Sequence, residues 1–432
     1  MEVGLRLPQE YQEAIDAFFQ HYYPYNYPPH LPGNPNTNVA APGNVDPLHD
    51  LNPYADDSLQ VVMTLTRPDG SQTMKWGLFM REGKWLDDTD PNAKLVQDDS
   101  DPLFPYHIRF RFSPDLEGTW MFSLSVMAPH ASTLISAPLP NLYSSGWTVI
   151  CDPPLADNKG PLSVNPNNRS ALWFEDSEEP FFGLGVNMAD KSSGPASYPA
   201  GTHWTSYYLR DHGEMEQTME RLHAVGGNFI RMYLMRNMFA PEWVNQGVYD
   251  AFKTPQVCIS DYLPGCDNSG WSTGLTGNCQ FQCWAFDRML DQARANNLYI
   301  QLYFDLYPPV VDYEKSIWGA HPYVIRFLES ERQVGGDPLD IKRFFFTPGE
   351  PLNDPRNVMC WWKRKYKYVM SRWGWSVNIP IIEPFNEIDR LLSYSDRPSM
   401  SPDPNIPCSA WHEAPDWGTC LENRVDWWTD AY

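Results

Sequence analysis

An asparagine and a glutamate stand together at the end of a short apolar run, within the segment 381–389 (IIEPFNEID). A carboxylic acid placed there could protonate the leaving oxygen of a glycosidic bond, and a neighbouring amide could hydrogen-bond the sugar 2-hydroxyl as positive charge develops. Barrel enzymes carry their chemistry at this end of their strands. We therefore predict Glu387 as a general acid/base and Asn386 as its partner. The alternative for Glu387 is a strand-end acid that caps a helix.

Polar residues also end the neighbouring apolar runs. Arg231 lies in the second run, where a guanidinium could hold a carboxylate ionised or form a buried ion pair between strands. Asn187 and Asp305 end the first and third runs, and they fit either the polar floor of a site or helix caps. Glu383 shares the face of Glu387, and we interpret it as a hydrogen-bonded core acid.

Aromatic residues make up 14% of the chain, with 18 tryptophans. Their flat faces stack on the apolar faces of sugar rings while their polar edges stay hydrated. Most of them must belong to hydrophobic cores. We predict substrate contacts for Tyr233, in the same run as Arg231, and for Trp318 and His321, in the loop expected after the third strand. A structural histidine is the alternative for His321.

Strand-like and helix-like segments alternate from residue 180 onward, which indicates a parallel sheet with outer helices. Pro384 cannot donate to a central ladder, so it is expected near the carboxyl end of its strand. We predict an incomplete α/β (TIM-type) barrel made of its first four to five strand–helix units. The expected strands are 181–186, 228–235, 298–304 and 379–385. Three helical faces are expected between them: Met215/Met219/Leu222/Val225, Ala285/Met289/Ala293 and Trp362/Tyr366/Val369. The first of these helices is expected to be closed by Gly226-Gly227.

The residues before position 180 follow a different hydrophobic pattern. Alternating apolar and polar runs broken by turn signals over residues 58–150 predict an antiparallel β-sandwich. Segment 88–92 could bind Ca²⁺ or form a solvated hairpin loop. The expected division is an N-terminal segment with a short helix at 8–23 and a proline-rich linker (1–54), the sandwich (55–151), a connector (152–179) and the partial barrel (180–432).

Charge and hydropathy exclude two classes of partner. A net charge of −22 with no basic cluster opposes binding to the phosphates of nucleic acid. No stretch approaches the roughly 18 apolar residues of a membrane span, and the first residues lack a signal peptide. We expect either an intracellular protein or one whose N-terminus is incomplete here. No cofactor is expected, and the oligomeric state is not indicated.

Eight cysteines favour an exported protein. One loop rich in Gly, Asn and Ser contains four of them, Cys258, Cys266, Cys279 and Cys283. Another loop is bracketed by Cys408 and Cys420. Disulfides are the main interpretation. Free thiols and a zinc site remain alternatives, although the spacing lacks the paired CxxC knuckles of common zinc sites.

Several segments together resemble bacterial clan A glycoside hydrolases of the cellulase-like and apiosidase-like kind, in which a β-sandwich precedes a (β/α)8 barrel. The resemblance implies a retaining double displacement on plant or algal polysaccharide, with Glu387 as acid/base, Asn386 on the 2-hydroxyl and Arg231 near the nucleophile. It also implies secretion to the periplasm, the cell surface or the medium. The segments are 159–164 (KGPLSV), 180–188 (PFFGLGVNM), 226–231 (GGNFIR), 372–375 (RWGW) with 383–387 (EPFNE), and, for the sandwich, 106–110 (YHIRF) and 118–120 (GTW).

Only 45 residues follow Glu387 in the 432-residue chain. The nucleophile of this family is a glutamate after the seventh strand, so we expect it to be missing and the chain to be an inactive fragment. The family's frequent histidine at the third strand is not evident here, where Asp305 and Tyr307 stand. A carbohydrate-binding or cell-surface protein without the chemistry is the alternative, and a zinc-organised activity at the cysteine loop is a third.

Overall fold

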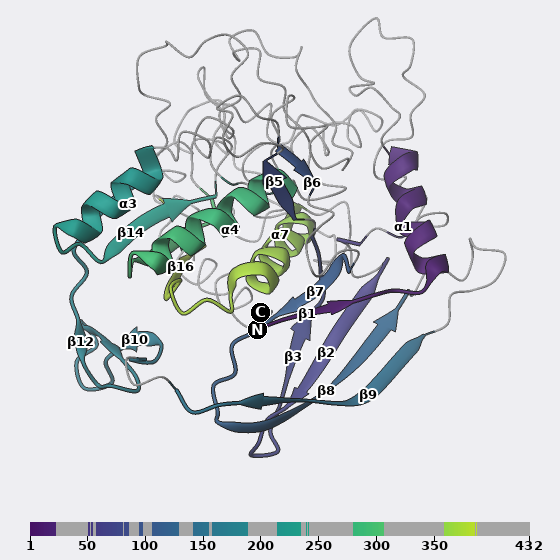
Figure 1. Ribbon diagram of the computed structural model, residues 1–432, viewed down its shortest axis with the longest axis horizontal. Helices are drawn as coiled ribbons and strands as arrows, with labels where there is room; N and C mark the ends of the chain where they lie inside the picture. The colour runs from purple at the N-terminus through teal and green to yellow at the C-terminus, as the bar shows by residue number, and fades with distance from the viewer. Residues whose placement is uncertain are drawn as a thin grey trace, which may run out of the picture.

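The computed structural model of the chain is shown in Figure 1. It combines antiparallel sheets in the first part of the chain with a parallel sheet and helices in the second. The residues that the structure describes are 1–22, 51, 53–54, 58–80, 82–85, 95–97, 106–128, 141–154, 158–188, 214–234, 239, 241, 280–305, 358–384 and 386.

Two antiparallel sheets share one hydrophobic core, as the alternating pattern over residues 58–150 predicts. The larger has the order β3-β2-β8-β9 and the smaller the order β1-β7-β4. Met63, Phe110 and Trp120 are almost completely buried between them. The strands are β1 (Glu2–Leu5), β2 (Gln60–Thr66), β3 (Gln72–Trp76), β4 (Leu78–Phe79), β7 (Ile108–Arg111), β8 (Gly118–Met127) and β9 (Leu142–Cys151).

The N-terminal segment contributes to this core. Strand β1 pairs antiparallel with β7, and the helix expected at 8–23 is α1 (Gln9–Tyr22). Tyr11 and Ile15 of α1 lie in the same buried cluster as Phe110. Strand β1 was not expected from the sequence, because its four residues carry too weak an alternation and depend on a partner strand more than 100 residues away.

Two small antiparallel sheets complete the first part of the chain. One joins β5 (Gly83–Trp85) to β6 (Leu95–Gln97), and segment 88–92 between them lies outside the described residues. The other, with the order β10-β11-β12, follows the sandwich. Its strands are β10 (Leu162–Val164), β11 (Leu172–Phe174) and β12 (Pro180–Phe181).

The second part of the chain contains a parallel sheet with the order β13-β14-β15-β16. Each strand pairs with the next one along the chain, so the expected second, third and fourth strands are confirmed with shorter bounds. Met219, Met289 and Trp362 are almost fully buried on the helices between them. The elements are β13 (Gly185–Asn187), α3 (Glu214–Ala224), β14 (Phe229–Tyr233), α4 (Gln280–Ala295), β15 (Tyr299–Tyr303), α7 (Val358–Trp373) and β16 (Ile381–Glu383).

Two details of the predicted parallel unit are wrong. The first strand is not one buried run over 181–186: Phe181 pairs with β11, and the parallel strand β13 is exposed along its length. It is one of the two edge strands of this sheet among the described residues. Val225 is 82% exposed rather than part of the helical face. Helix α3 already ends at Ala224, and Gly226, with φ of 84°, turns the chain away in a left-handed conformation.

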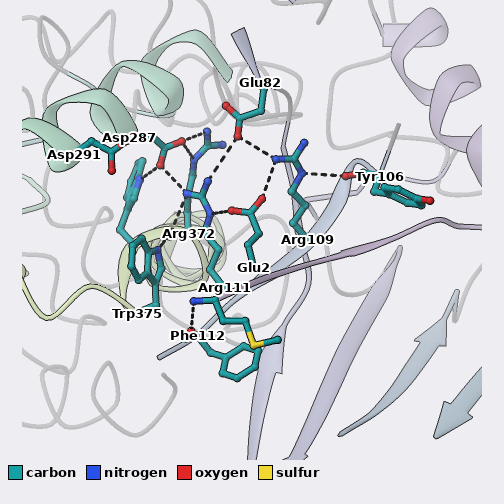
Figure 2. A network of polar contacts seen from close by, with 12 residues as sticks. Glu2, Glu82, Tyr106, Arg109, Arg111, Phe112, Asp287, Asp291, Arg372 and Trp375 are labelled. Carbon is teal, nitrogen blue, oxygen red and sulfur yellow. Dashed lines mark hydrogen bonds and ion pairs between the residues drawn. The ribbon is translucent and has the colours of Figure 1, made fainter. Parts of the chain in front are cut away.

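A buried network of charges joins the sandwich to the helices α4 and α7 (Figure 2). Arg111 on β7 donates to Glu2 at 2.6 Å and to Asp287 on α4 at 2.8 Å. Arg372 on α7 donates to the other oxygen of Asp287 at 2.5 Å. Arg109 binds Glu2 at 2.9 Å and Glu82 at 3.0 Å. Five segments that lie apart in the sequence are therefore held at one point, namely β1, Glu82, β7, α4 and α7.

Two further features bear on the sequence-based expectations. None of the helices in the described ranges has the length and apolar composition needed to cross a bilayer. Cys283 is buried on α4, while Cys258, Cys266 and Cys279 lie outside the described residues, as do Cys408 and Cys420. Within the described residues no group of His, Cys, Asp and Glu side chains is arranged to hold a metal ion.

Candidate functional site

Polar and aromatic side chains gather on one face of the parallel sheet. Along β14 and β15 successive side chains point to alternate faces of the sheet. Ile230 and Leu302 lie on the buried face, at 0% and 1% exposure. Strand geometry points the intervening residues to the opposite face. Register places Tyr233 beside Tyr303 and Tyr303 beside Glu383. The opposite face thus carries polar and aromatic groups toward the carboxyl ends of the strands.

Arg231 is the centre of this group. Its Nη2 lies 2.6 Å from Oε2 and 2.7 Å from Oε1 of Glu383, and its Nε donates to Oε2 at 3.2 Å. The same Nη2 donates to Oδ1 of Asn386 at 2.5 Å. The side chains of Arg231 and Glu383 are 26% and 23% exposed, so the pair is partly accessible. One guanidinium therefore connects a carboxylate with the predicted companion of the acid/base.

Neighbouring side chains fix the position of this pair. Gln301 on β15 donates its amide hydrogen to Oε2 of Glu383 at 2.8 Å. The guanidinium of Arg231 lies over the ring of Tyr303, 4.5 Å from its centroid, and that ring packs on Tyr233 with centroids 5.1 Å apart. Such contacts add cation–π and aromatic packing to the ion pair. Tyr233 and Tyr303 are mostly buried, at 8% and 7% exposure, so the two rings support the site more than they line it.

The side-chain amide of Asn386 has a defined orientation. Arginine only donates hydrogen bonds, so the oxygen and not the nitrogen of the amide must face Arg231. The Nδ2 hydrogens therefore point to the other side of the amide. The backbone is held as well, because the N–H of Asn386 donates to the carbonyl of Asp305 at 2.8 Å. Asn386 is 9% exposed, and its amide nitrogen faces away from the guanidinium.

Asp305 contacts helix α7. Lys365 donates to Oδ1 of Asp305 at 2.9 Å and to the carbonyl of Phe304 at 3.0 Å. The two side chains are 2% and 9% exposed. On the next residue of α7, the hydroxyl of Tyr366 donates to the carbonyl of Pro384 at 2.7 Å. Pro384 follows the last residue of β16, as its missing N–H requires.

The structure brings together five of the residues singled out from the sequence: Arg231, Tyr233, Asp305, Glu383 and Asn386, with Asp305 joined to Asn386 through its backbone carbonyl. Asn187 lies on the exposed edge strand, in register with Arg231. Glu387, Trp318 and His321 lie outside the described residues, so their roles stay predictions.

Three residues of the site were missed. Gln301 and Tyr303 occupy the same strand face and could have been found from the alternation along β15. Lys365 lies three residues after Trp362 and four before Val369, which places it on the buried face of α7. The helical period of these apolar neighbours was therefore a sufficient signal for an inward-facing lysine.

Comparison with known proteins gives distant structural matches. A provisionally assigned glycoside hydrolase of Bacteroides vulgatus ATCC 8482 matches over 86% of this chain at 14% identity and a TM-score of 0.40. The chain spans about half of that protein, since the match covers 50% of it. A hyperthermostable endocellulase matches over 54% of this chain and 59% of its own, at 12% identity and a TM-score of 0.23.

An endocellulase of Pyrococcus horikoshii, solved as a complex with cellotetraose, matches over 46% of this chain and 51% of its own, at 12% identity and a TM-score of 0.17. No protein-family model and no curated protein matches the chain. At these TM-scores and identities the structural matches do not establish a shared fold or activity. What the chain does must therefore be argued from its own side chains.

Proposed function

We propose that the protein is a glycoside hydrolase, with Glu387 as general acid/base and Asn386 as the donor to the sugar 2-hydroxyl. The observation that carries this proposal is the contact between Arg231 and Asn386 at the carboxyl edge of the parallel sheet. It turns the amide nitrogen away from Arg231, in the residue immediately before the predicted acid. The parallel sheet is proposed to be the first half of a (β/α)8 barrel, in which the active site lies at this edge.

The chemistry follows from charge development at the sugar. Departure of the leaving group gives the ring oxocarbenium character, and a hydrogen bond to the 2-hydroxyl strengthens as that charge grows. An amide donor fixed before the reaction costs little reorganisation at that moment. The ion pair of Arg231 with Glu383 supplies this fixation. A retaining mechanism on plant or algal polysaccharide, by an exported protein, completes the proposal.

Hydrolysis of aryl glycosides by the full-length protein tests the role of Glu387. The probes are phenyl and 2,4-dinitrophenyl glycosides of glucose, galactose, mannose and xylose in both anomeric forms. Phenol is a poor leaving group that needs protonation, whereas dinitrophenol leaves without it. We expect Glu387→Gln to lower kcat/KM on phenyl glycosides by about 100- to 10,000-fold, with a much smaller loss on dinitrophenyl glycosides.

The matched control is Glu179→Gln, a substitution at an exposed ion pair with Lys159. It should leave both rates unchanged. Equal rates for the wild type and Glu387→Gln on the phenyl substrates would remove Glu387 from the mechanism. Absence of hydrolysis of every glycoside by the wild type, combined with binding of the sugars, would favour a carbohydrate-binding protein.

A further inference from the structure

We infer that Lys365 and Asp305 form a positioning pair that holds Asn386 in place from helix α7. This inference rests on the proposed function of Asn386. It assigns Asp305 a different role from the substrate contact predicted from sequence. Both residues act through the backbone of the strand ends and not by touching a sugar.

The contacts form a short path from the helix to the site. The ammonium group of Lys365 binds Oδ1 of Asp305 and the carbonyl of Phe304, at 2.9 Å and 3.0 Å. The carbonyl of Asp305 accepts the backbone N–H of Asn386 at 2.8 Å. Phe304 and Asp305, directly after β15, are therefore held on one side by a charge on α7, and the carbonyl of Asp305 holds Asn386 on the other.

A second contact of the same helix acts on the neighbouring strand. Tyr366 donates to the carbonyl of Pro384, two residues before Asn386. Its ring packs edge-on against Phe304, with centroids 4.5 Å apart. Adjacent residues of α7 thus hold the ends of β15 and β16, and Asn386 lies at the point where both constraints meet.

The burial of the charges argues for a role beyond stability. The side chains of Lys365 and Asp305 are 2% and 9% exposed, and desolvation of such a pair carries a cost that the attraction often does not recover. Apolar side chains of similar size would pack in the same place at least as favourably. What they could not do is direct hydrogen bonds at the carbonyl of Phe304 and fix the orientation of the following peptide.

The test compares the full-length wild type with the double variant Lys365→Met/Asp305→Leu, which replaces both charges and leaves neither one buried alone. The single variant Asp305→Asn keeps the shape of the side chain and removes its charge, while the amide oxygen can still accept a hydrogen bond from Lys365. The control is Lys159→Met, which removes an equally short ion pair, 2.7 Å from Glu179, that lies on the surface. Hydrogen exchange of the Asn386 backbone amide is the first measurement, because it does not depend on activity.

We expect exchange of the Asn386 amide to become at least about tenfold faster in the double variant, with a smaller increase in Asp305→Asn and none in Lys159→Met. We also expect kcat on phenyl glycosides to fall by about 100-fold with little change in KM. The corresponding 2-deoxy glycosides, which lack the hydroxyl that Asn386 would contact, should show a much smaller loss.

Unchanged exchange of the amide would overturn the inference, as would an unchanged kcat. An equal loss on the 2-hydroxy and 2-deoxy substrates would also overturn it, because it would reveal a general loss of structure. A wild type without glycosidase activity would refute the proposed function alone. In that case the hydrogen-exchange result still decides whether the pair holds Asn386.

Discussion

Asn386 presents its two amide atoms to two different surroundings. Its oxygen faces Arg231, while its nitrogen faces away from the guanidinium. A substitution that keeps one atom and replaces the other can therefore separate support from chemistry. Asn386→Asp is such a change, because aspartate keeps an oxygen toward Arg231 and loses the donor.

We predict that Asn386→Asp lowers kcat/KM on phenyl glycosides by about 100- to 1,000-fold, the usual effect of removing one fixed donor. The free energy of unfolding should change by less than about 1 kcal/mol, because a stronger bond to Arg231 offsets repulsion from Glu383. Steady-state kinetics and urea denaturation measure the two effects. Retention of wild-type activity would show that the amide nitrogen has no part in the reaction.

A second prediction concerns the fork geometry of Arg231. Lysine keeps the charge but cannot bridge Glu383 and Asn386 with a planar set of donors. We expect Arg231→Lys to lower the unfolding free energy by about 1–3 kcal/mol and kcat by at least about tenfold. Chemical denaturation and kinetics on the same samples provide the check.

The matched control for this change is Arg294→Lys. Arg294 lies 3.5 Å from Asp291, and the two side chains are 48% and 70% exposed. Solvent screens such a pair, so the stability should change by less than about 0.5 kcal/mol. If both lysine variants behaved alike, the bidentate contact of Arg231 would have no special role.

Some of these residues could be predicted from the sequence and others could not. Asn386 was found because it follows an apolar run, where strand ends meet at one edge, and Arg231 because it is a charged residue within such a run. The pairing of Arg231 with Glu383 could not be derived, since it links residues 152 positions apart across two strands. For Asp305 the sequence indicated the position but not which neighbour its carboxylate contacts.

At the scale of elements, helix α7 connects the site with the sandwich. Lys365 and Tyr366, in the middle of the helix, contact the strand ends, and Tyr368 and Arg372 follow in its C-terminal part. The hydroxyl of Tyr368 donates to the carbonyl of Phe79 in β4 at 3.0 Å. Figure 1 shows the helix between the parallel strands and the sandwich strands. Its apolar period was readable from the sequence, whereas its two sets of polar partners were not.

Asp287 on α4 gives a pH-dependent prediction for these helices. Burial alone would raise the pKa of Asp287, but the guanidinium groups of Arg111 and Arg372 outweigh it and lower that pKa below its usual 3.8. A lowered pKa stabilises the fold at pH values above about 4, and this contribution is lost as the pH falls through the folded-state pKa. We expect Asp287→Asn to cost about 3–5 kcal/mol of unfolding free energy at pH 7.

The difference between Asp287→Asn and the wild type should shrink as the pH falls below about 4, measured by urea denaturation from pH 3 to 7. Glu82→Gln is the control with the opposite sign. Burial, reinforced by the charge of Asp287, raises the pKa of Glu82. A raised folded-state pKa contributes stability at low pH, and this contribution is lost as the pH rises through the folded-state pKa. Glu82→Gln should therefore cost less unfolding free energy at pH 7 than at low pH. A cost for Asp287→Asn that is independent of pH would contradict the assignment.

At the scale of the whole molecule, one charged network determines how the sandwich meets the helices of the parallel sheet. The alternating strands of the sandwich and the period of the helices were predicted from local patterns. Their junction was not, because it depends on Arg111 of β7 meeting Asp287 of α4. The short strand β1 contributes to this junction through Glu2. Local sequence patterns therefore predicted neither the strand nor the junction.

The last prediction concerns this junction. Arg111 is 11% exposed and bonds to both Glu2 and Asp287, so Arg111→Met removes the charged link between the sandwich and α4 while keeping an apolar stem. We expect one calorimetric unfolding transition for the wild type and two for the variant, because removing the charged link weakens the coupling between the two cores. The buried link should also resist 1 M salt, which screens mainly exposed charges.

Arg67→Met provides the comparison within the sandwich. Arg67 binds Asp115 at 3.0 Å, with side chains 32% and 57% exposed, and takes no part in the junction. Arg67→Met should lower the temperature of the single unfolding transition slightly without splitting it into two. Two transitions in the wild type, or one in Arg111→Met, would mean that the charged network does not couple the two parts. In that case α7 would position Asn386 without help from the sandwich.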